Sequence, residues 1–200
     1  MGIARAAIMI QTELTPERAT EATLLARCRE GDLEAFGSVY ALHERAVFRY
    51  AYGLLGHRED ADDIKQETFL RAHKAISRFR GDSGVQTWLF RICGNLCRDR
   101  IKSWDRRNLA YDGGDAQEWE SADEKSDPAH LAEKAELSAI VWRALGGLPP
   151  AHREVMVLHE VEELDYAAIA EIIGCSKVSV KLRVFRARKM LKERVEVLLQ

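Results

Sequence analysis

Residues 166–176 read YAAIAEIIGCS, a short apolar helix followed by a tight turn. The small side chains of this helix let a second helix pack closely across it, and Gly174 supplies the residue that tolerates a positive φ angle in the turn. Asp165 is placed to cap the first helix, and the second is predicted to run from about Lys177 to Leu198. The pattern therefore predicts a helix-turn-helix.

The last helix combines an apolar stripe with a strongly basic surface. At about 100° per residue, one narrow stripe faces the core; it consists of Val180, Val184, Ala187, Leu191, Val195 and Leu198. Basic residues crowd the segment from Lys177 to Arg194, in which Glu193 is the only acid. Such density favours attraction to phosphates, and a solvated basic helix without a ligand is the alternative. Val178, Leu182 and Phe185 point outward, where we expect them to contact bases in a major groove or to pack on a partner.

Helical periodicity also dominates the first half of the chain. We expect four helices, over Thr23–Glu30, Leu33–Leu55, Glu59–Ser77 and Val85–Arg107. Asp32 caps the second of these helices and Gly56 ends it. Residues 1–20 are expected to form a loose leader. Because no segment favours a strand, the predicted fold class is all-α.

An acidic segment divides the chain. Seven acidic residues lie between Tyr111 and Pro128 and are opposed only by Lys125, and Gly113-Gly114 interrupts the segment. This composition is typical of a flexible linker, so we place the linker at 108–128. A first domain is then expected over 21–107 and a second over 129–200. Helical periodicity returns from Leu131 to Leu145, and a further helix is expected from Ala151 to Val161.

Composition excludes several classes of protein. Hydrophobic residues make up 46% of the chain, enough for a core, and the net charge is −2. Four scattered cysteines do not suit a disulfide scaffold, so we expect reduced thiols. Cys93 and Cys97 share a helix face, which leaves a metal or redox pair open, although no further ligand stands at a suitable spacing. No apolar run of about 20 residues exists, and we expect a soluble, cytoplasmic protein.

The third expected helix has an unusual outward face. Its outward residues are Glu59, Asp63, Gln66, Glu67 and Leu70. An acidic patch around an exposed leucine indicates a docking surface with an apolar centre and a charged rim. A cation site built on paired carboxylates is one alternative, and a solvated acidic face is another.

Three motifs in this half have a recognisable order. They are DIKQETFLRA at residues 63–72, RFRGD at residues 78–82, and TWLFRI at residues 87–92 followed by Asn95. Together they resemble region two of the extracytoplasmic-function (ECF) sigma factors of bacteria. The segment from Leu164 to Leu191 resembles region four of the same family. The resemblance implies a non-enzymatic, two-domain protein that lends promoter recognition to RNA polymerase.

The resemblance implies a role for each group of residues. In the family, the acidic helix docks on the clamp helices of the largest polymerase subunit, through positions that match Asp63, Gln66, Glu67 and Leu70. The −10 element is melted and a flipped base is captured by positions that match Phe79, Arg80, Gly81, Asp82, Ser83, Trp88, Arg91, Asn95 and Arg98. The −35 element is read by positions that match Ser176, Lys177, Ser179, Lys181, Arg183, Phe185 and Arg186.

The implied partners are core RNA polymerase, including its flap, promoter DNA and an anti-sigma factor. No cofactor, metal, small-molecule substrate or direct membrane insertion is implied. A flipped base needs stacking and edge donors, which Phe79 and Asn95 offer, whereas Trp88 taken alone also suits a core position. Basic residues after Asn95 are expected to hold the DNA backbone, and the acidic linker is expected to thread the RNA channel of the polymerase.

Two alternatives remain from the residues alone. A helix-turn-helix regulator would dimerise and bind a palindromic duplex without polymerase. A nuclease would use Asp62, Asp63 and Glu67, although no complete acid–base or metal constellation appears.

Overall fold

The computed structural model describes residues 16–106 and 138–199, and these residues form helices, turns and loops without a strand. The all-α prediction is therefore confirmed for the described part of the chain. Residues 1–15, 107–137 and 200 lie outside it, and so do most of the expected leader and the whole expected linker at 108–128. None of the described helices is long and apolar enough to cross a membrane.

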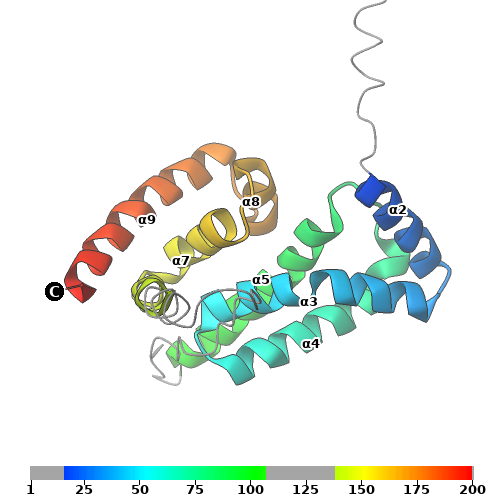
Figure 1. Cartoon of the computed structure of the whole chain (residues 1–200), viewed down its shortest axis with the longest axis horizontal. Coiled ribbons are helices and arrows are strands. Elements are labelled where there is room, and N and C mark those ends of the chain that lie inside the picture. Colours follow the sequence, from blue (N-terminus) through cyan, green and yellow to red (C-terminus); the bar gives the residue numbers. More distant parts are fainter. Residues whose placement is uncertain (1–15, 107–137, 200) are drawn as a thin grey trace, which may run out of the picture.

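The first unit contains α2 (Pro16–Arg29), α3 (Leu33–Leu55), α4 (Arg58–Ala75) and α5 (Val85–Arg106). Figure 1 shows α3, α4 and α5 together, with α2 across one end. A 3₁₀ turn, η1 (Ile76–Arg78), leads from α4 into the loop before α5. The prediction of a leader up to residue 20 was wrong for its last part, because α2 begins at Pro16. A proline suits the first position of a helix, where its missing N–H is not needed.

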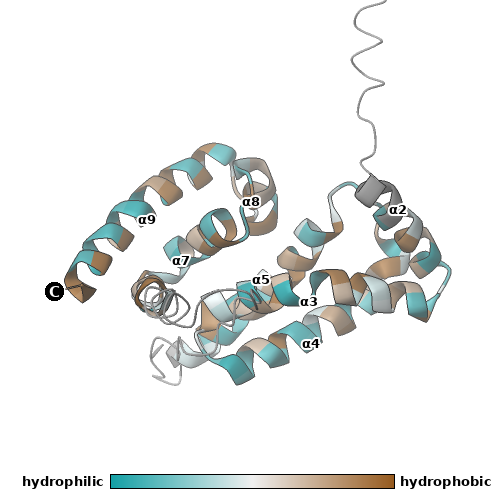
Figure 2. Cartoon of the chain, in the orientation of Figure 1, coloured by the Kyte–Doolittle hydropathy of each residue, from teal (hydrophilic) through white to brown (hydrophobic). Residues whose placement is uncertain are grey.

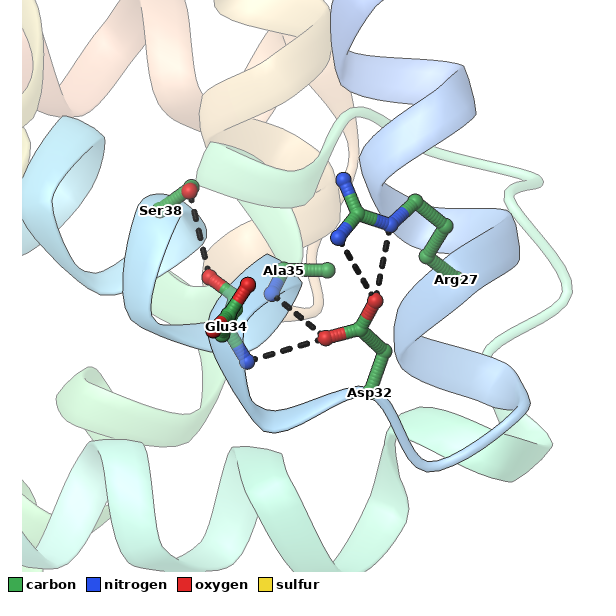
Figure 3. A network of polar contacts seen from close by, with 5 residues as sticks. All are labelled: Arg27, Asp32, Glu34, Ala35 and Ser38. Carbon is green, nitrogen blue, oxygen red and sulfur yellow. Dashed lines mark hydrogen bonds and ion pairs between the residues drawn. The ribbon is translucent and has the colours of Figure 1, made fainter.

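Local capping explains the bounds of α3, which match the prediction. Asp32 Oδ1 accepts hydrogen bonds from the backbone N–H groups of Glu34 (2.9 Å) and Ala35 (3.1 Å), while Oδ2 accepts one from Arg27 Nε (2.8 Å; Figure 3). The Ala35 bond and the Arg27 contact hold the pKa of Asp32 below its ordinary value. At the other end Gly56 has a φ of 74°, the left-handed conformation that a glycine adopts without strain.

The second unit begins with helical residues 138–146. It continues with α7 (Pro150–Met156), a π-helical turn η3 (Val157–Val161), α8 (Tyr166–Ile173) and α9 (Lys177–Leu198). The helix-turn-helix is confirmed, because α8 and α9 have their predicted bounds and Gly174 between them has a φ of 69°. Asp165 caps α8 by accepting from the N–H groups of Ala167 and Ala168, both at 2.8 Å.

Buried apolar residues of both units form one contiguous core. On α5 the periodicity of the sequence predicts an apolar stripe of Trp88, Leu89, Ile92, Leu96 and Ile101, and this prediction is only partly right. Leu89 and Leu96 are buried, but Trp88, Ile92 and Ile101 are only half-buried. Phe90, Cys93 and Cys97, outside that stripe, are fully buried because α3 covers this side of α5.

The predicted stripe on α9 is correct only for its first half. Val180, Val184 and Ala187 are buried, whereas Leu198 lies on the surface. The last turns of α9 border an open groove against residues 143–149, so no residue of the described ranges seals their apolar side. Figure 2 shows the mixture of polar and apolar residues along α9 and the largely hydrophilic visible face of α4.

Candidate nucleic-acid and partner interfaces

The structure brings the predicted docking residues of α4 together. Asp63, Gln66 and Leu70 are exposed and Glu67 is half-buried. With part of α5 they line an open groove of about 740 Å³. Helical phase predicts that the opposite side of this segment, with Ala61, Ile64, Thr68, Ala72, Ala75 and Ile76, points inward. All six are buried except Ala75, which is half-buried, so this phase is confirmed. An exposed leucine in a charged groove is the arrangement that a protein partner with an apolar protrusion and basic surroundings would fit.

Cations surround the acids of this groove. Arg71 Nε lies 2.7 Å from Glu67 Oε1, and Arg100 of α5 pairs with Asp60 and lies 3.8 Å from Asp63. Asp62 is held by Lys65 at 2.7 Å. The carboxylates that a nuclease would need are thus spread among cations. Among the described residues no group of His, Cys, Asp or Glu could hold a metal ion.

The loop before α5 is ordered by stacking. Phe79 is buried and lies against the half-buried ring of Trp88, with centroids 4.6 Å apart and planes 28° from parallel. Arg29 of α2 donates to the carbonyl of Phe79 at 3.0 Å. Phe79 therefore supports Trp88 in this conformation and does not offer an open face to a base. The exposed part of the loop consists of Arg80, Gly81, Asp82 and Gly84, with Arg80 paired to Asp82 at 3.0 Å.

A cavity of about 660 Å³ lies beside this loop. Its walls are α2, His43 of α3, residues Gly81–Gly84 and the first turn of α5. His43 Nε2 is 3.2 Å from Glu21 Oε1, and burial lowers the pKa of His43 although Glu21 opposes the shift. The contribution of Glu21 and Ala22 to this cavity was missed from the sequence, because the helix was expected to begin only at Thr23.

The polar residues predicted on α5 lie together, but they face the second unit. Arg91 Nη2 is 2.5 Å from Glu171 Oε1 of α8, and Arg98 pairs with Glu154 of α7. Asn95 Oδ1 accepts from Arg98 Nη2 at 2.5 Å. These glutamate partners were not predicted from the sequence, because each lies 56 or 80 residues away along the chain.

The predicted −35 residues surround the start of α9. Ser176 caps the helix by accepting from the N–H of Ser179 at 3.2 Å, and the two hydroxyl groups lie 2.9 Å apart. Lys177, Lys181, Phe185 and Arg186 are exposed, and Arg183 is half-buried. Among the described residues no ion pair involves Lys177, Lys181 or Arg186. Val178 and Leu182 are exposed as predicted, so α9 presents free cations beside apolar side chains.

The cysteines are free and mostly inaccessible. Cys28, Cys93 and Cys97 are buried and Cys175 is half-buried. Burial raises the pKa of Cys97, and hydrogen bonding to Cys93 adds to that effect. The thiolate that redox or metal chemistry needs is therefore disfavoured at Cys97.

Comparison with known proteins covers both units. The family model for Sigma-70 region 2 matches residues 39–107, and that for Sigma-70 region 4 matches residues 138–191. The ECF RNA polymerase sigma-E factor of Escherichia coli K12 is 32% identical over 189 residues, which cover 92% of this chain and 98% of the relative. The sigma-E factor of Haemophilus influenzae is also 32% identical, over 191 residues covering 92% of this chain and 99% of the relative.

Solved structures of sigma factors are also similar to this chain. CnrH, in complex with the cytosolic domain of CnrY, is 29% identical with a TM-score of 0.66; the match covers 89% of this chain and 98% of that one. RpoE of Bartonella quintana, in complex with the anti-sigma factor NepR, has the same fold at 24% identity and a TM-score of 0.66, with 81% and 97% of the two chains covered. With both regions matched in order and nearly the whole relative aligned, the chain belongs to the ECF sigma factors of bacterial RNA polymerase.

Proposed function

We propose that this sigma factor binds core RNA polymerase through α4 and reads promoter DNA through α5 and α9. The exposed Leu70 in the acidic groove of α4 carries the first part, because such a face fits a basic, apolar-tipped partner. We assign it to the clamp helices of the largest polymerase subunit. The second unit is assigned to the flap.

The proposed DNA contacts are assigned mainly from the positions of basic side chains. On α9 the unpaired Lys177, Lys181 and Arg186 suit phosphates, and the exposed Phe185 suits a thymine methyl or a sugar edge at the −35 element. The loop 80–83 and the polar face of α5 with Arg91, Asn95 and Arg98 are assigned to the −10 element. Trp88, supported by Phe79, is placed to stack at the upstream edge of the melted region.

The wider role follows the family. We propose a cytoplasmic transcription initiation factor for a stress or environmental-response regulon, held inactive by an anti-sigma factor. RpoE was solved with the anti-sigma factor NepR bound and CnrH with the cytosolic domain of CnrY bound, and these complexes support such a partner.

In vitro transcription tests the proposal. Core RNA polymerase with this protein is run on a library of promoters, with core enzyme alone as control. Selective start sites downstream of a two-box motif are expected. A duplex gel shift with the pure protein tests the regulator alternative, because tight binding without polymerase contradicts the sigma mechanism.

A further inference from the structure

Among the described residues, three ion pairs join the two units. Each links an arginine of α3 or α5 to a glutamate of the second unit; the pairs are Arg49 with Glu162, Arg91 with Glu171 and Arg98 with Glu154. The Arg49 pair is bidentate, with Nε and Nη2 each 2.7 Å from a different oxygen of Glu162. Planar, bidentate recognition of this kind serves carboxylates and phosphates equally well.

Two of these glutamates are deeply buried. The Glu162 side chain is 0% exposed and that of Glu154 is 7% exposed. Glu154 also accepts a hydrogen bond from the hydroxyl of Tyr50 at 2.8 Å. Burial raises the pKa of Glu154, while Arg98 and Tyr50 oppose the shift. Each buried carboxylate is paired with an arginine, and Glu154 also accepts from Tyr50. Such satisfied buried charges indicate a specific interface between the units.

Two helix glycines permit the close approach. A Cβ atom on Gly53 of α3 would lie 2.8 and 2.9 Å from the methyl carbons of Val157 and 3.1 Å from the Trp142 ring. A Cβ atom on Gly94 of α5 would lie 3.2 Å from Glu154 Oε1 of the second unit, and 2.6 Å from the hydroxyl of Tyr50 on the neighbouring α3. Glycine weakens a helix interior relative to alanine, so both positions lose helix stability in exchange for this contact. Arg153 adds a hydrogen bond across the interface to the Leu54 carbonyl, at 2.6 Å.

The polymerase-binding groove stays open in this arrangement. Asp63, Gln66 and Leu70 of α4 remain exposed, while Arg91 and Arg98 of α5 are engaged in ion pairs with glutamates of the second unit. Docking on a partner through α4 therefore does not require the units to separate, whereas access of DNA to Arg91 and Arg98 does.

We propose that the basic face formed by Arg49, Arg91 and Arg98, termed here the arginine face, has two mutually exclusive occupants: the glutamates of the second unit and the phosphates of single-stranded promoter DNA. The inference rests on the proposed function, which assigns Arg91 and Arg98 to the −10 element. The protein with its two units in contact, the closed state, then binds DNA weakly, since only the fraction of molecules whose units have separated can bind it. The proposal adds Arg49 to the DNA-contacting residues, although Arg49 lies outside the motifs that resemble the family.

The test uses the full-length protein and two pairs of variants. Gly53→Ala forces the interface apart without a change of charge, and Gly37→Ala on the same helix is its control because a Cβ there meets nothing within 4 Å. Glu162→Gln removes a buried partner of the arginine face. Its control is Glu160→Gln, which makes the same charge change at a residue paired with Arg188 inside the second unit.

Two quantities are measured for each protein: the radius of gyration by small-angle X-ray scattering, and the affinity for a fluorescein-labelled, mixed-sequence single-stranded DNA of 20 nucleotides. Gly53→Ala and Glu162→Gln are expected to expand the protein and to raise the affinity about tenfold, while both controls match the wild type. Circular dichroism verifies that helicity is kept. If either variant is folded but as compact as the wild type, or expanded with unchanged DNA affinity, the competition is refuted.

Transcription separates this inference from the proposed function. A wild-type protein that gives core polymerase no selective start sites refutes the sigma role, and the scattering and DNA results still decide the competition. Conversely, normal initiation with no effect of Gly53→Ala or Glu162→Gln on compactness refutes the closed state alone.

Discussion

Leu70 offers the sharpest test of the polymerase-binding groove. It is 56% exposed, so a partner can cover just over half of its surface. Full burial of a leucine contributes about 1.5–3 kcal/mol, so truncation to alanine should cost about 1–1.5 kcal/mol of binding free energy. That corresponds to roughly a tenfold weaker Kd. Alanine is a good helix former, and Leu70 makes no core contact, so α4 should keep its fold.

The measurement is a competition in which unlabelled Leu70→Ala displaces fluorescent wild-type protein from core RNA polymerase. Leu42→Ala is the matched control, because Leu42 is 63% exposed on α3 and belongs to no predicted interface. The control should compete as the wild type does. Equal competition by the two variants would refute the assignment of this face.

Three further predictions concern separate parts of the molecule. Asp165→Ala should lower the free energy of unfolding by about 1 kcal/mol at neutral pH. Hydrogen bonds from the N–H groups of Ala168 and Ala167 depress the pKa of Asp165, so this loss should be fully present above the unfolded pKa of about 3.9 and should vanish as the pH falls through the lower pKa of the folded state. A difference in urea titrations that does not change with pH would contradict this. Tyr50→Phe removes a donor to buried Glu154 and should cost about 1.5–3 kcal/mol, so an unchanged urea midpoint would count against the buried ion pair. Phe185→Ala should weaken binding of the holoenzyme to −35 duplex DNA in a filter assay while leaving its affinity for core polymerase intact, and a parallel loss of both would show a structural role instead.

The sequence predicted those parts of the fold whose causes are local. Asp32 and Asp165 accept hydrogen bonds from N–H groups two and three residues away, and Gly56 and Gly174 take left-handed conformations at helix ends. Each signal lies within a few residues of the boundary that it sets, so α3, α8 and α9 were placed correctly. The acidic face of α4 was equally local, because helical phase alone separates Ile64 from Asp63.

Features that depend on distant residues were not predictable in this way. Phe79 was expected to meet a base, but Trp88 of the next helix covers it. Arg49 and Glu162 are separated by 113 residues, and no periodicity connects them. A glycine in the middle of an apolar helix, such as Gly53, was the one signal of close packing available in the sequence. Such a glycine does not indicate which other segment packs against it.

The energetics of the interface explain how a buried ion pair can be stable in the closed state and still be replaced by an arginine–phosphate pair. Removing one member of a buried pair strands the other, which is costly, but replacing a carboxylate by a phosphate leaves no arginine unpaired. On opening, Glu154 and Glu162 pass from a buried site into water, where they need no partner. The Arg91–Glu171 pair, with side chains 43% and 42% exposed, contributes little in either state. The closed and DNA-bound states therefore differ by a small net free energy, which contacts made only in the open state, such as those of promoter DNA with Arg91 and Arg98, are able to supply.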